Sequence, residues 1–593
     1  MSRHPPKPRL ALTIGVTGHR LSRAPSPDET AASAPRRFDV AAVAAALQAV
    51  FAVAARGVAA IDAAAKAGFS DAPPVITLIS SLAEGADRIA AHAALAAGWA
   101  LDVALPCPQP IYARTFVENG SREEFETLLG RARATLILPL PGGESAPTDQ
   151  RLPAAFEAAG LTMLAQSDIL VAVWDGLPAD GRGGTGQIVE EAARRGAPIV
   201  VVDPQNGATR LLWSDVPLAA ATGRRAAEIA PQPLEPALAA VIAHLVGPPA
   251  APDERVGLEQ YFASRVGAGA NRRASRVFDG RDLEAPRAQW PRVSAAVDGA
   301  PVNRAAAKRY AQALLAAEDV AARHAAAYRR LFLISSAVSV AAAALVAGAA
   351  RLHALHVVAA GFEFVTVGRV GAAVWFATRR RWHHQWFEAR EVAERLRVVA
   401  PAWLLGAWPS HLKPAQAAWP GWCARAVARE LPLFSGEVGQ LVDEIRAILA
   451  TLIDEQLAYH HANAERLERR DRVYEGFGVG LLAASLLNNA AYLGARLIDA
   501  TALQGFESWA LAAAILLPAA ATAAYGVRLF GDYEDLARRS RRTAEQLRAL
   551  KTRVTTALDL AGLRAATEAA SQAMLSDLDA WRVAVESRRL SAS

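Results

Sequence analysis

Short apolar runs alternate with amphipathic, alanine-rich stretches over residues 1–205. The runs are nearly free of charge, and the stretches between them repeat apolar residues at helical spacing. Because apolar strands joined by helices are typical of a parallel sheet covered on both faces, this pattern predicts an α/β, Rossmann-like domain. The predicted strands are 10–16, 75–80, 101–105, 135–140, 168–174 and 198–203, and the predicted helices are 40–67, 83–97, 153–166 and 187–195.

Longer apolar stretches follow in two close pairs in the second half of the chain. The stretches 331–350, 476–495 and 508–527 hold no charged residue, and 357–377 is mostly apolar. A helix of about 20 residues spans roughly 30 Å, the thickness of the hydrocarbon core of a bilayer. We therefore expect an all-α membrane region with four transmembrane helices in two hairpins. Buried helices of a large soluble domain are the alternative.

Basic residues flank each pair on its outer sides. Arg329 and Arg330 precede the first pair, and the run 379–381 follows it; "RLERRDR" at 466–472 precedes the second pair, and Arg528 follows it. By the positive-inside rule both hairpins then begin and end in the cytoplasm. The pattern predicts a multi-pass protein with both termini and its helical stalks on the cytoplasmic side.

Polar residues inside the predicted spans need partners. Glu363 and Arg369 would each cost roughly 2.5–3.5 kcal/mol at the centre of an isolated helix. Their spacing puts them on different helix faces, so each must meet another partner, a neighbouring protomer or water. They fit either a polar pore or a distorted interfacial segment. Asn488 and Asn489 are expected to join helices across an oligomer.

The two hairpins resemble a repeat. "REVAERLR" at 390–397 follows the first pair and "RRTAEQLR" at 541–548 follows the second, so both share A-E-x-L-R at a similar distance from a hairpin. Charges at this spacing favour a helical stalk with i, i+4 pairs. Chance recurrence in a chain rich in alanine and arginine is the alternative.

The overall composition limits the remaining classes. The chain has 593 residues, enough for two to four domains. Its net charge of +6 comes from arginine clusters beside the apolar stretches, so no nucleic-acid partner is expected. Cys107 and Cys423 are too far apart in the sequence to indicate a disulfide framework or a cysteine metal site. We expect no metal, no cofactor and a reducing compartment, and the N-terminal apolar run is too short for a signal peptide.

Three loops follow predicted strands and offer groups for an anionic ligand. They are "GVTGHR" at 15–20, the start of "SSLAEGADRIAAHAAL" at 80–95, and the glycine-rich loop in 167–196. Ligands of parallel sheets bind beyond the carboxyl ends of the strands, where helix N-termini attract phosphate. Any one such loop is often only a turn, but three such loops on one sheet are stronger evidence for a ligand site. The predicted ligand-binding residues are Gly15, Thr17, Gly18, His19, Arg20, Ser80, Ser81, Glu84, Gly85, Arg88, Asp175, Gly183, Gly184, Thr185, Gly186 and Glu190.

These motifs resemble those of a known superfamily. The segment 80–91 resembles the S-G-x-A-x-G-x-D segment of the DNA-processing (Smf) family, and "GRGGTGQIVEEA" resembles the GGxGTxxE motif of the LOG phosphoribohydrolases. Together they define the SLOG superfamily, whose Rossmann-like domains bind nucleotides or nucleotide-derived signals. In LOG enzymes an acid follows the motif threonine by three residues, whereas this chain has Ile188 there and its acids at Glu190 and Glu191. A two-residue slip rotates a helical side chain by about 200°, so the resemblance implies binding more than catalysis.

Each predicted hairpin with its basic helix resembles the SLATT domains, membrane effectors associated with SLOG sensors in bacterial conflict systems. The resemblance covers roughly 305–400 and 455–560 and implies a homo-oligomeric protein of the bacterial inner membrane. The predicted domains are a SLOG-like domain at 1–205, a connector at 206–304 in which "GLEQYF" packs back on that domain, the first hairpin and stalk at 305–400, a cytoplasmic helical linker at 401–454, and the second hairpin with C-terminal helices at 455–593.

The hypothesis that follows is a membrane effector that senses a nucleotide signal and acts as a ligand-gated pore or membrane-disrupting protein in anti-phage defence. Its partners would be a small nucleotide ligand and the lipid bilayer. The alternatives are a membrane-tethered, LOG-like nucleotide hydrolase and a tether with neither catalysis nor gating. Binding must favour the open arrangement over the closed one, or the ligand shifts nothing.

Overall fold

The computed structural model describes residues 3–20, 38–116, 120–142, 147–179, 181–214, 224–267, 289–349, 382–412, 418–498, 507–557 and 559–590, with short pieces between 361 and 372. The chain divides into two compact units. The first holds Met1–Asp319, Ala389–Leu452 and Leu550–Leu575, and the second holds Val320–Glu388, Ile453–Ala549 and Ser576–Ser593. Each unit therefore combines segments that lie far apart in the sequence.

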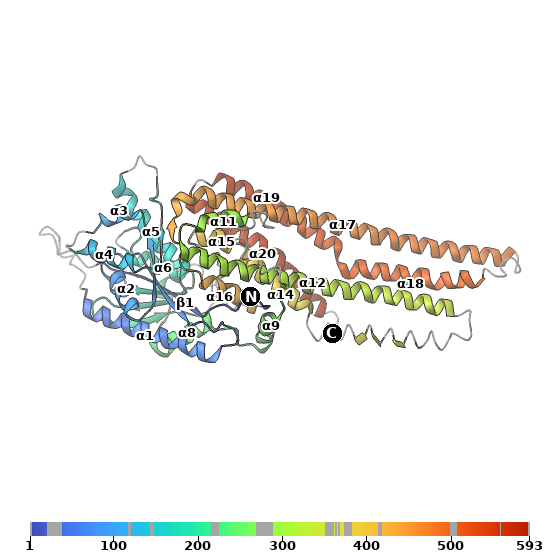
Figure 1. Ribbon diagram of the computed structural model, residues 1–593, viewed down its shortest axis with the longest axis horizontal. Coiled ribbons are helices and arrows are strands. Elements are labelled where there is room, and N and C mark those ends of the chain that lie inside the picture. Colours follow the sequence, from blue (N-terminus) through green and yellow to red (C-terminus); the bar gives the residue numbers. More distant parts are fainter. Residues whose placement is uncertain are drawn as a thin grey trace. The chain divides into compact units, whose positions relative to one another are not determined.

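A mostly parallel sheet forms the centre of the first unit (Figure 1). Among the described residues it has nine strands in the order β8-β7-β6-β5-β1-β2-β3-β4-β9, and β7 and β8 run antiparallel to their neighbours. All six predicted strands are present, so the α/β prediction is confirmed. They are β1 (Ala11–Gly18), β2 (Val75–Ser80), β3 (Ala100–Leu105), β4 (Ala134–Ile137), β5 (Ile169–Val173) and β6 (Ile199–Val202).

Helices cover both faces of this sheet. Connections between parallel strands are right-handed, so helices leading toward β4 lie on one face and those leading back through β5 to β6 lie on the other. The apolar strands are buried on both sides for this reason, and every residue of β5 and β6 is buried. The helices are α1 (Val40–Ala64), α2 (Ala86–Ala96), α3 (Gln109–Ala113), α4 (Ser121–Gly130), α5 (Thr148–Gln166) and α6 (Thr185–Arg194).

Helix α1 is long and apolar enough to cross a membrane, yet it packs within the first unit. Asp39 caps it by accepting a hydrogen bond from Ala42 N at 2.9 Å. Its side chains Val43, Leu47 and Val50 are almost fully buried. The helix contacts α2 and α8 (Leu234–Val246), so its apolar face is a core face of the α/β unit.

The first unit extends well beyond residue 205. Residues predicted to form only a connector supply two strands and several helices, and "GLEQYF" packs back in α9, where Leu258, Tyr261 and Phe262 are buried. Residues predicted to form a stalk and linker supply the edge strand β9, which pairs with β4. These elements are β7 (Thr209–Leu212), η2 (Ala226–Glu228), β8 (Pro231–Gln232), α9 (Pro252–Ala263), α11 (Gln289–Val297), α15 (Val399–Leu404), η4 (Ser410–Leu412), α16 (Trp419–Arg429) and β9 (Gly436–Glu437).

The remaining described elements are long helices, so the mostly helical C-terminal part is also confirmed. Among the described residues, three helices are long and apolar enough to cross a membrane: α1, α17 and a stretch from Trp509 that runs through α18 and α19. The helices are α12 (Pro301–Ala349), α14 (Trp382–Arg397), α17 (Val438–Ile498), α18 (Glu507–Gly531), α19 (Tyr533–Thr556) and α20 (Leu560–Leu590).

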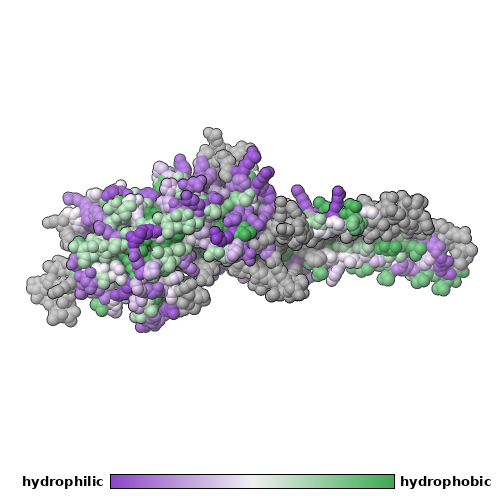
Figure 2. Space-filling view, turned by 90° about the horizontal axis from the view of Figure 1, so that it is seen from below, coloured by the Kyte–Doolittle hydropathy of each residue, from purple (hydrophilic) through white to green (hydrophobic). Residues whose placement is uncertain are grey.

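Helices α17 and α18 pair in the second unit. Asn488 Nδ2 donates to Ala510 O at 2.9 Å, and Arg528 forms an ion pair with Asp471 at 2.8 Å. Many of their exposed side chains are apolar, and Leu486 and Leu487 are each 71% exposed. Figure 2 shows hydrophobic residues, in green, among hydrophilic ones along the long helices. Soluble proteins rarely expose such a large apolar surface, so this pair has the surface of helices that face lipid.

The predicted spans have different outcomes. The stretches 476–495 and 508–527 lie in α17 and α18. Helix α12 includes the stretch 331–349, but most of 357–377, including Glu363, lies outside the described residues. Arg369 is helical and exposed. The Asn488 amide donates a hydrogen bond within its own hairpin, so it does not require the predicted hydrogen bond to another protomer.

Candidate functional site

The sheet order places a topological switch point beside β1. The chain places β2, β3 and β4 successively on one side of β1 and then returns to place β5 on its other side. Gly18 at the end of β1 lies beside Val173 at the end of β5, because the two strands are parallel and in register. In open α/β sheets ligands bind at such a switch point, beyond the carboxyl ends of the strands.

The loops after β1, β2 and β5 meet at this point. The His19 Nε2 atom lies 3.1 Å from the Asp175 carboxylate, and His19 N donates to Val173 O at 3.2 Å. Ala86 N, at the start of α2, donates to His19 O at 3.3 Å. Gly18 is packed so closely that an added Cβ would lie 2.3 Å from Ala86 Cβ. These contacts join the three loops at one end of the sheet.

Asp87 fills the amide-lined end of the loop after β2. Its carboxylate accepts hydrogen bonds from Ser80 Oγ at 3.1 Å and from Ser81 N at 3.2 Å. Burial raises the pKa of Asp87 to about 6, while these hydrogen bonds and the nearby Arg20 oppose the shift. Leu82 in the same loop has a left-handed backbone with φ +56°, which is costly for a branched side chain and is typical of functional loops.

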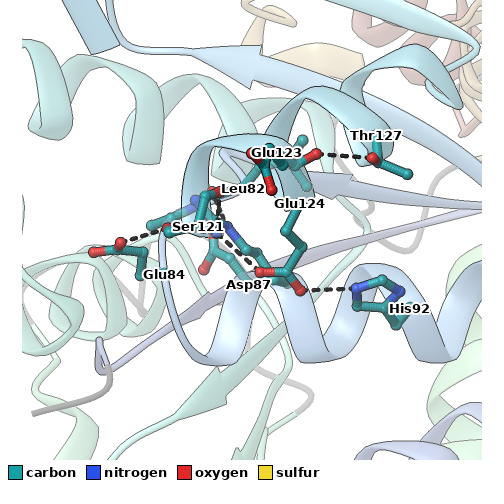
Figure 3. A network of polar contacts seen from close by, with 10 residues as sticks. Leu82, Glu84, Asp87, His92, Ser121, Glu123, Glu124 and Thr127 are labelled. Atoms are coloured by element: carbon teal, nitrogen blue, oxygen red, sulfur yellow. Dashed lines mark hydrogen bonds and ion pairs between the residues drawn. The ribbon is translucent and has the colours of Figure 1, made fainter. Parts of the chain in front are cut away.

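Arg88 ties α2 to α4 in a buried polar network (Figure 3). Its guanidinium donates to Ser121 O and Ser121 Oγ, each at 2.8 Å, and to Glu124 Oε2 at 2.9 Å. Ser121 Oγ in turn donates to Glu84 Oε1 at 2.5 Å. The side chains of Arg88 and Glu84, both predicted to bind the ligand, are therefore largely hydrogen-bonded within the protein.

An aromatic cluster borders the site. The Tyr112 ring makes edge contacts with Phe116 at 4.9 Å, Phe125 at 5.7 Å and Phe156 at 6.3 Å between centroids. The Arg20 guanidinium lies over the Phe156 ring, 5.2 Å from its centroid. Burial, together with the neighbouring Asp87, raises the pKa of the Tyr112 hydroxyl, which stays neutral at physiological pH. The contact holds the Arg20 cation over the ring face at the border of the site.

The glycine-rich loop is fixed against α5. Gly183 has φ +83°, and an added Cβ there would lie 2.5 Å from Glu157 N, so both its conformation and its position require glycine. Gly183 N donates to Gln187 Oε1 at 2.7 Å, and Glu157 receives hydrogen bonds from Gln187 and Arg182, each at 2.5 Å. Helix α6 therefore begins at an ordered loop, with Gly184 at its N-cap.

The start of α6 leaves donors for an anion. The first amides of a helix have no partner within the helix, and the helix dipole makes this end positive. The predicted residues Thr185 and Gly186 occupy the first turn, and no acidic residue lies in that turn. Asp87 already fills the loop before α2, which leaves the dipole of α6 to attract a phosphate. Thr185 and Gly186 are themselves buried, and the segment 177–179 packs against Gly186.

The two acids of α6 lie elsewhere. Glu190 Oε2 accepts a hydrogen bond from Ala226 N at 3.1 Å, in the segment at η2. Glu191 pairs with Arg194 and Arg195 along its own helix, each at 2.5–2.6 Å. Neither side chain joins the loops described above, so Glu190, which was predicted as a ligand residue, is instead part of the contact between α6 and η2.

The predicted site residues thus divide into two groups. Thr17, Gly18, His19, Arg20, Ser81 and Asp175 come together at the switch point, whereas Ser80 is fully buried and Gly15 lies against Met163 and Ser167 of the adjoining α5 segment. No sequence motif selects Tyr112, which lies in α3, or Phe156, which lies in α5. Their only signal is the rarity of aromatic residues, 7% of the chain.

Comparisons with known proteins add no relative. No family model, no curated protein and no solved structure matches the chain. The class of protein is therefore defined by the structure alone: a doubly wound α/β unit with a topological switch point, on a chain with long apolar helices.

Proposed function

We propose that the protein is a membrane effector controlled by a nucleotide-derived ligand. The observation that carries the proposal is the combination, in one chain, of a topological switch point where Arg20, His19 and Asp175 come together and a helix pair with exposed apolar side chains. The ligand binds beyond β1 and β5, and binding changes the permeability of the bilayer around the helical hairpins. The SLOG and SLATT resemblances support this pairing of sensor and effector in bacterial defence.

The groups at the switch point support an anionic ligand. Arg20 supplies positive charge beside Phe156, and the first turn of α6 supplies the positive end of a helix dipole. The Tyr112 ring is buried against Phe156, so it supports that ring from within and is not itself a surface for the ligand. A phosphate near Arg20 and the start of α6 uses both sources of positive potential.

The long helices support the membrane part of the proposal. Leu497 and Ile498 at the end of α17 are 87% and 88% exposed, which is stable in lipid and unfavourable in water. In the proposed topology the two hairpins contribute four spans, and the basic residues at 329–330, 379–381 and 466–472 stay in the cytoplasm with both termini.

Helices shared by the two units offer a route for coupling. Helices α12, α14, α17, α19 and α20 each have residues assigned to both units. A shift of the first unit's end of such a helix is transmitted along a continuous hydrogen-bonded rod. Coupling further requires that the ligand bind one arrangement more tightly than the other.

The arrangement of α6 argues against the hydrolase alternative. Glycosidic-bond hydrolysis needs a carboxylate beside the sugar. Glu190 bonds to Ala226 and Glu191 pairs with arginines on its own helix. If the protein is a hydrolase after all, it will release free base from nucleoside monophosphates.

The test uses full-length protein in detergent and in dye-loaded vesicles. A panel of nucleoside mono-, di- and triphosphates, cyclic oligonucleotides and ADP-ribose is screened for a rise in Tm and for dye release. We expect one class to do both, and Arg20→Gln to weaken both, whereas the exposed Arg131→Gln should leave both unchanged. The absence of any Tm shift would remove the sensor from the proposal, and binding without dye release would leave only a tether.

A further inference from the structure

A second polar cluster lies away from the switch point, near the amino ends of the strands. Asp168, just before β5, is buried and accepts hydrogen bonds from Arg425 Nη2 at 2.6 Å and from Arg429 Nε at 2.9 Å. Both arginines lie on α16, in the segment predicted to be a cytoplasmic linker. Arg425 is 4% exposed, Arg429 is 7% and Asp168 is 2%.

The charges of this cluster do not balance. Asp168 carries one negative charge against the two guanidiniums of α16. The neighbouring Asp102 is matched by Arg133, whose Nε and Nη2 bind its two oxygens at 2.9 and 2.6 Å. One positive charge is therefore left over at a depth where an unpaired ion costs several kcal/mol.

The hydrogen bonds of the cluster do not balance either. Among the described residues, Arg425 Nε, Arg425 Nη1, Arg429 Nη1 and Gln166 Nε2 are buried donors without a hydrogen-bond partner. Gln166, the last residue of α5, is 5% exposed. An unsatisfied buried donor is costly, and native structures usually satisfy it with protein, water or an ion.

The same residues line one small cavity. Its volume is about 10 Å³, and Gln166, Arg425 and Arg429 contribute to its wall together with Thr13, Thr77 and Asp102. A space of about 10–15 Å³ on this measure holds one water-sized particle. Phosphate, and any nucleotide, is too large for it, while a halide is only slightly larger than water.

We propose that a single small monovalent anion of halide size, such as chloride, binds among Arg425, Arg429 and Gln166. The anion balances the extra positive charge and accepts hydrogen bonds from the unpaired donors. A water molecule would accept hydrogen bonds but would leave the charge unbalanced. It thereby fastens α16 to the sheet at β1 and to the end of α5. This site is separate from the proposed nucleotide site and does not depend on it.

The test measures the Tm of the full-length protein in detergent, with chloride replaced by gluconate at constant ionic strength. We expect Tm to rise by a few degrees with chloride and to saturate, and bromide to replace chloride. Crystals grown in bromide should show an anomalous peak in the cavity. Equal Tm in chloride and gluconate, or a water without anomalous signal, would overturn the proposal.

A charge-matched variant provides the second test. Gln166→Glu places a carboxylate where the anion is proposed, so we expect the chloride dependence to disappear and the Tm in gluconate to equal or exceed that of the wild type. Gln166→Leu has nearly the same volume without the charge, and it should keep a chloride dependence. If both variants respond to chloride like the wild type, the salt acts elsewhere and the proposal fails.

Discussion

Removal of the Asp168 carboxylate should destabilise the first unit more than any change of a surface ion pair. Asp168→Ala leaves both Arg425 and Arg429 buried without their shared acceptor, and it also removes the acceptor of Thr13 N, which donates to Asp168 Oδ2 at 3.1 Å. Breaking a buried pair by removing one partner typically costs about 3–5 kcal/mol, because the remaining charge stays in an apolar environment.

The expected shift in Tm follows from the size of the unit. With about 400 residues in the first unit and an unfolding entropy near 2.1 cal/mol/K per residue, a loss of 3–5 kcal/mol lowers Tm by roughly 4–6 °C. Acid should have a similar effect on the wild type. Although burial alone would raise the pKa of Asp168, Arg429 and Arg425 hold it below its usual value. The stability it contributes is present above the unfolded pKa and is lost as pH falls through the lower folded pKa.

Tryptophan fluorescence can follow the unfolding of α16 once the other tryptophans are replaced, because Trp419 and Trp422 are buried on α16 itself. The matched control is Glu468→Gln, which breaks an exposed pair with Arg541 and should leave Tm nearly unchanged. A double-mutant cycle of Asp168→Ala with Arg429→Ala should show that the two losses are strongly non-additive. Additive losses, or a Tm for Asp168→Ala equal to that of the control, would refute the reasoning.

Three further outcomes are expected. Gly183→Ala should lower Tm and weaken ligand binding, because the new Cβ meets Glu157 N and φ is +83°, while Gly181→Ala in the same loop meets nothing within 4 Å and should be neutral in both assays. Asp87→Asn should flatten the dependence of Tm on pH. The pKa of Asp87 is raised to about 6, so in the wild type its stabilising contribution is complete below the unfolded pKa and is lost as pH rises through 6. The loss in the wild type is on the order of 2–3 kcal/mol. Leu486→Arg should reduce the membrane-bound fraction after cell lysis, since arginine in a span costs roughly 2.5–3.5 kcal/mol, and Leu486→Phe should not.

The hydrophobic pattern was sufficient to predict the centre of the sheet. Continuous runs such as Ile169–Val173 have one explanation, burial on both faces, and the structure places each predicted strand within a few residues of its expected bounds. The prediction failed at the edges. Strand β9 has only two residues and lies about 300 positions after its partner β4, so no local pattern could reveal it.

Only those site residues that directly follow the ends of parallel strands could be predicted from the sequence. Loops after β1, β2 and β5 must meet if the sheet is parallel, and His19 and Asp175 do meet. No comparable rule predicts which helix side chains reach the site. Arg88 has the chemistry of a ligand residue, yet its guanidinium is hydrogen-bonded to Ser121 and Glu124, because α4 begins beside it. Phe156 is a candidate only because the structure places Arg20 over its ring.

The boundary of the α/β unit is the most consequential difference between pattern and structure. A fragment ending at residue 205 looks complete by its strands, yet it lacks α16, β9 and the part of α20 that holds Arg564. Arg564 Nη2 donates to Thr162 Oγ1 and to Leu405 O, each at 2.8 Å, so even the C-terminal helices satisfy groups of the first unit. Without α16, Asp168 loses both its cationic partners and the sheet loses the cover above Thr13. We therefore expect residues 1–205 alone to be expressed in aggregated form or with the loose packing of a molten globule, detectable by loss of the near-UV circular dichroism signal, and the full chain to show neither. A well-packed, monomeric fragment with a sharp unfolding transition would mean that the sheet is stable without the segments after residue 205. The buried arginines of α16 would then not be needed for its stability.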